Sequence, residues 1–249
     1  MNESAEITKE LARGQFTEQM LDEMRSLIGT ELRYDGCQNN EYATRLAILR
    51  FAEGIGDGNP LWTDPAYAEK SVHGGLIAPP SFIFACLGSI QVGWRGLGGF
   101  HAETQLTFNK PIRVGDFITP RVTFDGFDGP IDSSFGGRRI KDYLRQEYRN
   151  QDNELVAEFI CSRMRFERGE MQKRAPSRAI ELPHPWTDEQ IAEIETQILA
   201  EKPRGSEPLY WEDVNVGDEI PLVTKGPIGL SDEIAVSYTH LTLPTTPYV

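Results

Sequence analysis

The spacing of apolar residues near the N-terminus predicts two amphipathic helices. In the first, over Phe16 to Gly29, Thr17 suits an N-cap and Gly29 supplies the stop. Phe16 and Leu21 stand at the two positions of a hydrophobic staple around that cap. A second helical pattern runs from about residue 40 to residue 55 and ends among glycines. Each pattern gives one apolar stripe, so we expect each helix to pack one face on a core.

The segment from Pro79 to Trp94 has a different pattern. It carries no formal charge and is apolar around most of its helical circumference. A helix of this kind belongs inside a protein. Pro79 and Pro80 suit its first turn, where a backbone N–H has no intrahelical partner. We therefore expect one long buried helix over this segment.

After Gly99 the pattern changes to β-rich runs separated by turn residues. The runs are Thr104–Phe108, Phe117–Phe124, Arg139–Tyr148 and Leu155–Phe166. The turns between them contain Gly115-Asp116, Asp128-Gly129-Pro130 and Asn150–Asn153. Consecutive strands after a buried helix predict an α+β fold, with the helix on one face of an antiparallel sheet. A doubly wound parallel sheet is disfavoured because helices do not alternate with the strands.

The last third of the chain changes composition. Residues 169–205 are polar and contain proline, and a capping box at Thr187 and Gln190 predicts a short surface helix there. Residues 206–235 are acidic and too few for a core of their own. Residues 236–249 resemble translated sequencing-adapter read-through, so we exclude them from fold reasoning as not native. The expected division is an N-terminal tail (1–15), a domain (16–168), a linker (169–205), the start of a second domain (206–235) and the excluded C-terminal residues (236–249).

Composition and charge limit the function classes. Of 249 residues, 25 are Lys or Arg and 38 are Asp or Glu, which gives a formal net charge of -13. This charge repels phosphate backbones, so we expect no nucleic-acid partner. No apolar run is long enough to span a membrane and no secretory start is present, so we expect a cytoplasmic protein. Three widely spaced cysteines support neither a disulfide framework nor a zinc site.

Three short motifs carry the most functional information. Gly56–Leu61 reads GDGNPL, Asp64–Ala68 reads DPAYA, and Lys110–Asp116 reads KPIRVGD. In combination with the apolar segment 79–94, these motifs resemble the MaoC-like (R)-specific enoyl-CoA hydratase/dehydratase family over about residues 16–167. The resemblance implies a hot-dog fold, in which an antiparallel sheet wraps around a long buried helix. Residues 206–235 resemble the opening of a second such domain, as in the two-domain members.

The resemblance also implies a catalytic pattern, from which this chain departs twice. In catalytic members an Asp and a His activate the water that adds to an enoyl thioester. Asp57 keeps the Asp position, but the His position is Trp62, whose indole nitrogen can only donate a hydrogen bond. Pro80 falls where a glycine N–H would bind the thioester oxygen, and proline has no N–H. These departures imply a non-catalytic half that shapes the acyl pocket.

Candidate site residues follow with their alternatives. Asp57 is a candidate degenerate catalytic residue, or a turn residue of the Gly-Asp-Gly-Asn-Pro segment. His73, 16 residues later, is a candidate replacement base or a loop histidine. No His pair has metal-ligand spacing, so no metal site is expected. The residues expected to bind substrate are Asn59, Trp62, Gly75, Ile77, Ser81 and Phe82.

The resulting hypothesis is one half of an acyl-CoA hydratase/dehydratase. The substrate is a CoA or acyl-carrier thioester, with no further cofactor. The expected partner is the missing second hot-dog domain or a homologous subunit, and we expect a dimer. One alternative is an acyl-thioester-binding or assembly subunit that pairs with a separate catalytic chain. A hot-dog thioesterase is a weaker alternative because residues 79–94 offer only Ser81, Ser89 and Gln91 as polar side chains and no carboxylate.

Overall fold

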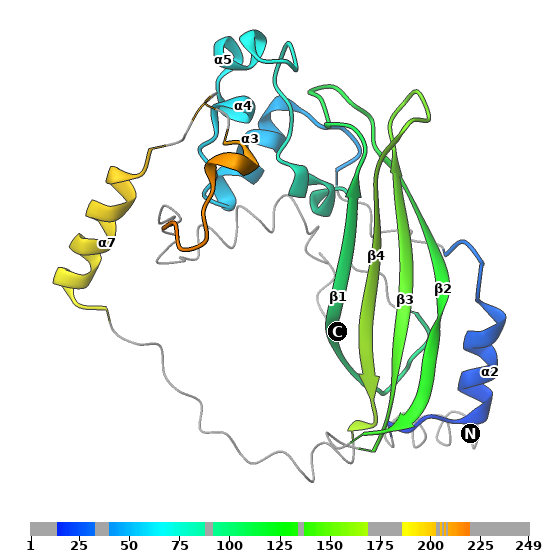
Figure 1. Cartoon of the computed structure of the whole chain (residues 1–249). Coiled ribbons are helices and arrows are strands. Elements are labelled where there is room, and N and C mark those ends of the chain that lie inside the picture. The colour runs from blue at the N-terminus through cyan, green and yellow to red at the C-terminus, as the bar shows by residue number, and fades with distance from the viewer. Residues whose placement is uncertain are drawn as a thin grey trace, which may run out of the picture.

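The centre of the protein is an antiparallel sheet. The computed structural model describes residues 14–32, 40–87, 92–133, 137–168, 186–202, 205, 207 and 209–219. Within these residues four strands pair in the order β1-β4-β3-β2 (Figure 1). Their bounds are β1 Gly98–Phe108, β2 Thr119–Asp132, β3 Arg138–Arg149 and β4 Leu155–Phe166. All four predicted strands are therefore present.

Strand β3 shows why the alternating pattern identified the sheet. Ile140, Leu144 and Tyr148 are each at most 1% exposed, while the odd-numbered residues from Lys141 to Glu147 point to the other, partly solvated face. A strand buried on one face has this period of two. Asp142 and Gln146 lie on the same buried face. The buried face of β3 therefore contains polar groups that require partners inside the protein.

Two strand boundaries differ from the prediction. Strand β1 begins at Gly98 rather than at Thr104. The two glycines at its start bring the backbone close to β4: a Cβ on Gly98 would overlap the Phe166 ring, and one on Gly99 would lie 2.8 Å from Nη1 of Arg165. Strand β2 continues through the expected turn at residues 128–130 to Asp132, with a register shift between Asp128 and Ile131. An irregularity within the β2–β3 pairing therefore takes the place of the predicted break.

Helix α2 forms as the cap and staple pattern predicts. It spans Glu18–Ser26, and the Thr17 hydroxyl accepts a hydrogen bond from the Met20 N–H at 3.2 Å. Phe16 and Leu21 are buried, as a staple requires. Past its end, Gly29 adopts a φ of 78° and donates its N–H to the carbonyl of Phe124 in β2. Figure 1 shows α2 beside β2.

Three further helices lie near one end of the sheet (Figure 1). Helix α3 spans Arg45–Gly54 and is shorter than the predicted segment 40–55, because Thr44 provides the N-cap. Helices α4 (Pro60–Thr63) and α5 (Pro65–Lys70) follow, capped by Asn59 and Asp64. Each begins with a proline, which a first helical turn accepts without loss of a hydrogen bond. The GDGNPL and DPAYA motifs are thus the starts of two short helices.

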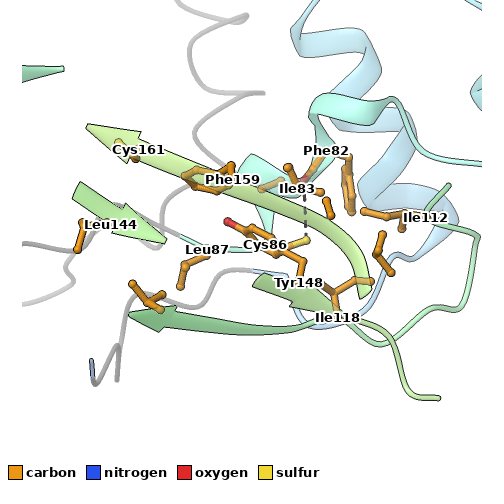
Figure 2. Packing of buried hydrophobic residues seen from close by; sticks show 14 of the residues in the cluster. Phe82, Ile83, Cys86, Leu87, Ile112, Ile118, Leu144, Tyr148, Phe159 and Cys161 are labelled. Carbon is orange, nitrogen blue, oxygen red and sulfur yellow. Dashed lines mark hydrogen bonds between the residues drawn. The ribbon is translucent and has the colours of Figure 1, made fainter. Parts of the chain in front are cut away.

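The apolar segment after residue 79 is buried as predicted, but its described part has a different form. In place of the start of a long α-helix, residues Pro80–Ala85 form the 3-10 helix η1, and residues 88–91 lie outside the described part. An apolar run without periodicity does not specify the helix type. Figure 2 shows this segment packed against the sheet, where Phe82, Ile83 and Cys86 lie among Tyr148 and Phe159.

The end of the chain is described only in part. Helix α7 spans Asp188–Ala200, and both hydrogen bonds of the predicted capping box at Thr187 and Gln190 are present. The short 3-10 helix η2 covers Trp211–Asp213. Several predicted segments lie outside the described residues. They are most of the expected N-terminal tail, residues 169–185 of the expected linker, the segment 220–235 and the excluded residues 236–249. Within the described residues, no helix has the length and apolar character to cross a lipid bilayer.

Candidate functional site

A largely apolar cavity of about 400 Å³ lies where the short helices meet the sheet. This volume is within the range of small-molecule sites. Its walls come from α4, from the segment that leads into η1, from the end of β1 with the loop after it, and from β4. The lining residues are Leu61, Trp62, His73, Ile77, Ala78, Pro79, Pro80, Ile83, Phe108, Asn109, Lys110, Pro111, Ile112 and Val156.

Backbone hydrogen bonds hold the cavity walls together. The Ala78 N–H donates to the carbonyl of Ile112 at 2.8 Å, which ties the entry of η1 to the loop after β1. The Lys110 N–H donates to the carbonyl of Val156 at 3.1 Å, which ties that loop to β4. Segments far apart in the sequence thus form a shared wall whose shape depends on main-chain contacts.

The polar groups of the cavity are few. Lys110 pairs through its ammonium with the carboxylate of Glu154, and this hydrogen bond lowers the pKa of Glu154. His73 is half-buried, and its backbone carbonyl accepts a hydrogen bond from Nη1 of Arg113 at 2.6 Å. The Lys110 ammonium is therefore already paired with the carboxylate of Glu154. Apolar groups form most of the remaining cavity wall.

The indole nitrogen of Trp62, one of the lining residues, is buried. Trp62 is only 8% exposed. It stands at the position that the resemblance gives to a catalytic histidine. Its indole N–H has no hydrogen-bond partner among the described residues. Because an indole nitrogen carries a permanent N–H, this group can donate a hydrogen bond but cannot take a proton from water.

Asp57 lies in a local turn and is not one of the lining residues. Its Oδ1 accepts the backbone N–H of Asn59 at 3.1 Å, and Oδ1 of Asn59 accepts the N–H of Leu61 at 3.0 Å. These are the hydrogen bonds of a turn and of the α4 cap. The structure therefore brings His73 and Trp62 to the cavity without Asp57 or Asn59.

The other residues expected to bind substrate divide between wall and core. Ile77 lines the cavity, whereas Gly75 and Ser81 do not. Phe82 is fully buried and packs edge-on against Phe51, with ring centroids 5.5 Å apart. Phe82 is thus a core residue beneath the site in this structure.

Cys86, next to this core, is not a candidate nucleophile. It is buried, and burial raises its pKa to about 12. A thiol with such a pKa stays protonated at neutral pH, and the thiolate is the reactive form. Among the described residues, no group of three or more His, Cys, Asp or Glu side chains has an arrangement suited to a metal ion.

Sequence reasoning missed the part of the cavity that comes from the sheet. Phe108, Asn109 and Val156 lie far along the chain from the GDGNPL motif, and only the folded pairing of β1 with β4 brings them to the site. Lys110 and Ile112 had a signal, since both belong to the KPIRVGD motif. The same motif folds as a turn, in which Oδ2 of Asp116 accepts the N–H of Arg113 at 2.7 Å.

An antiparallel sheet packed on a short apolar helix, with an apolar cavity at the helix entry, is the arrangement that a hot-dog fold predicts. Residues 27–159, just over half of the chain, match the family described as FAS1-like, dehydratase domain region, and the chain belongs to this family.

Individual relatives agree with this assignment. The chain is 31% identical over 124 residues to a UPF0336 protein of Streptomyces avermitilis, covering 47% of this chain and 79% of that one. It is 31% identical over 120 residues to a UPF0336 protein of Streptomyces coelicolor, covering 45% and 76%. A putative MaoC domain protein dehydratase from Chloroflexus aurantiacus has a similar structure, with a TM-score of 0.52 and 15% identity over 93% of this chain and 64% of that one. The expected hot-dog fold is thereby confirmed.

Proposed function

We propose that this domain binds an acyl thioester without hydrating it and works beside a catalytic hot-dog domain. The observation that carries the proposal is the composition of the cavity wall. Apolar side chains form most of it, together with Trp62, His73, Asn109 and Lys110, but no carboxylate lines it among the described residues. An apolar wall favours an acyl chain, because burial of apolar surface is the main source of its binding energy.

The chemistry of hydration supports the absence of turnover. A base must take a proton from the attacking water, and the enolate oxygen must receive a hydrogen bond. Trp62 cannot accept a proton, and Pro80 at the start of η1 has no N–H to donate. Oδ1 of Asp57 accepts a hydrogen bond within its own turn, and Asp57 does not line the cavity with His73.

The edge of the sheet supports a partner. Within the described part of the chain, β1 pairs only with β4, so its other side is an unpaired edge. Phe100, Leu106 and Phe108 of this strand are 50%, 38% and 48% exposed. An exposed edge strand with apolar side chains favours strand addition from another domain. The proposed partner is a second hot-dog domain, in a longer form of this chain or in a separate subunit.

The test measures binding and turnover separately. We expect the chain to bind octanoyl-CoA saturably by isothermal titration calorimetry, and to hydrate trans-oct-2-enoyl-CoA no faster than buffer in an absorbance assay. Pro80→Glu places a charge beside the acyl chain, so we expect affinity to fall by about tenfold or more. Pro65→Glu is the matched control, because Pro65 also begins a short helix but does not line the cavity.

Other outcomes would contradict the proposal. Hydration that Asp57→Ala or His73→Ala abolishes would show a working catalytic site. Release of free CoA from octanoyl-CoA would instead favour a thioesterase. Equal loss of affinity in the two Pro→Glu variants would place the binding site outside this cavity.

A further inference from the structure

One side of the 3-10 helix η1 forms part of the cavity wall. Within Pro80–Ala85, all of which the structure describes, Pro80 and Ile83 line the cavity and the remaining residues do not. A 3-10 helix has about three residues per turn, so side chains three positions apart lie above one another on the same side. The two lining residues therefore form one row along η1.

The exposure of the lining residues gives this row a direction. Pro80 is exposed, whereas Ile83 is only 1% exposed. Among the other lining residues, Phe108 is 48% exposed, while Ile112 and Val156 are 4% and 1% exposed. The cavity thus opens to solvent near Pro80 and Phe108. It ends against the cavity floor, which consists of Ile83, Ile112 and Val156.

The space behind Ile83 is packed core. Cys86, the next residue of the same row, caps the end of η1 and is fully buried. Figure 2 shows Ile83 and Cys86 close to Phe159, whose ring stacks on Tyr148 with a centroid distance of 5.6 Å. Protein interiors are close-packed. A ligand that reaches Ile83 therefore cannot go further along η1 unless it displaces these side chains.

We propose that Ile83 sets the longest acyl chain that this cavity accepts. The inference rests on the proposed acyl-thioester function and adds a specificity-determining residue to it. The polar thioester and its carrier stay near the open end at Pro80, because burial of polar groups without partners is costly. The acyl chain then extends along the η1 row, and its tip meets the Ile83 side chain.

This arrangement predicts how affinity depends on chain length. Each methylene that enters the apolar cavity removes apolar surface from water and should raise the affinity by about three- to fourfold. Once the tip of the chain touches Ile83, a further methylene must remain in water or displace the core. The affinity should then stop rising, which gives a break in its dependence on chain length.

The experiment titrates the full chain with saturated acyl-CoAs from butanoyl-CoA to dodecanoyl-CoA by isothermal titration calorimetry. For the unmodified chain we expect the break within this series. Ile83→Ala should move the break to acyl chains about two to three carbons longer, because the substitution removes the outer carbons of the side chain and leaves a cavity. Just beyond the original break, the variant should bind about tenfold more tightly than the unmodified chain.

Two further variants separate this role from a general loss of packing. Ile83→Val removes a single methyl group and disturbs folding less, and it should move the break by about one carbon. Ile140→Ala is the matched control, because Ile140 is also 1% exposed but lies in β3 and does not line the cavity. Ile140→Ala should leave the break where it is.

The outcomes distinguish this inference from the function on which it rests. A break that stays in place in both Ile83 variants, or that Ile140→Ala moves equally, would overturn the role of Ile83 and leave the proposed function intact. An affinity that rises through the whole series without a break would do the same. Failure of every acyl-CoA to bind the unmodified chain would overturn the proposed function and this inference together.

Discussion

Asp142 and Arg165 form an ion pair on the buried face of the sheet. Nε of Arg165 donates to Oδ2 of Asp142 at 3.0 Å, and the two side chains are only 10% and 1% exposed. A buried pair of this kind offsets the desolvation of both charges, so its value depends on both members. Loss of one member leaves a charge in a low-dielectric environment.

Arg165→Met tests this dependence. We expect the free energy of unfolding in urea to fall by about 3–5 kcal/mol, because the Asp142 carboxylate would remain buried without its cation. Arg121→Met is the control, since its pair with Glu31 is about half-exposed on both sides and should contribute no more than about 1 kcal/mol. Similar losses in the two variants would contradict the expected cost of burial.

At the scale of elements, Glu167 joins α2 to the sheet. Its carboxylate accepts the N–H of Phe16 at 3.1 Å and the N–H of Arg138 at 3.0 Å, and it pairs with the Arg138 guanidinium at 2.9 Å. Burial by itself raises the pKa of Glu167. The hydrogen bonds and the charge of Arg138 outweigh that effect, so the pKa lies below its ordinary value.

This lowered pKa predicts an acid dependence of stability. The stabilisation is fully present above the ordinary carboxyl pKa of about 4.3 and is lost as the pH falls through the lower folded-state value. Glu167→Gln should therefore be less stable than the unmodified chain at pH 7, by about 1–3 kcal/mol. The difference should shrink on acidification below about pH 4.3, as measured by urea unfolding across the pH range. A difference that does not change with pH would show that the charge of Glu167 is not involved.

The elements also show which signals a sequence contains. Strand β3 and helix α2 were predictable because the residues that determine them are local, namely the alternation around Leu144 and the cap at Thr17. The start of β1 was not predictable, since Gly98 marks a strand only because the Phe166 ring lies against it. The helix type of η1 was not predictable for a related reason, because a continuous apolar run indicates burial but contains no periodicity.

The same division applies to the site. Trp62 and Ile77 could be placed from the motifs around them, and both line the cavity. Phe108 and Val156 reach it only through the pairing of β1 with β4. Whether a motif position such as Asp57 points into a site or closes a turn depends on a hydrogen bond within that turn, which the spacing of residues does not reveal.

At the scale of the whole molecule, the position of β1 at the edge of the sheet, where it pairs only with β4 among the described residues, predicts association. We expect the chain to self-associate with increasing concentration in sedimentation velocity experiments, because Leu106 and its neighbours offer an apolar edge. Leu106→Lys should weaken this association by about tenfold or more, since a lysine on an edge opposes strand pairing. Val114→Lys changes a similarly exposed apolar residue outside β1 and should have little effect. A chain that remains monomeric at all concentrations would contradict the prediction.

Phe108 belongs to two surfaces at once. It is the last residue of β1, the edge strand of the described sheet, and it also lines the cavity. A domain that pairs with this edge would cover part of the cavity, so the energies of pairing and of ligand binding would not be independent. Thermodynamic linkage then requires that any factor by which a bound acyl group strengthens assembly is also the factor by which assembly strengthens the binding of that group. In the assembly proposed above, the availability of the acyl ligand would thus regulate, through this one side chain, how much of the complex is assembled.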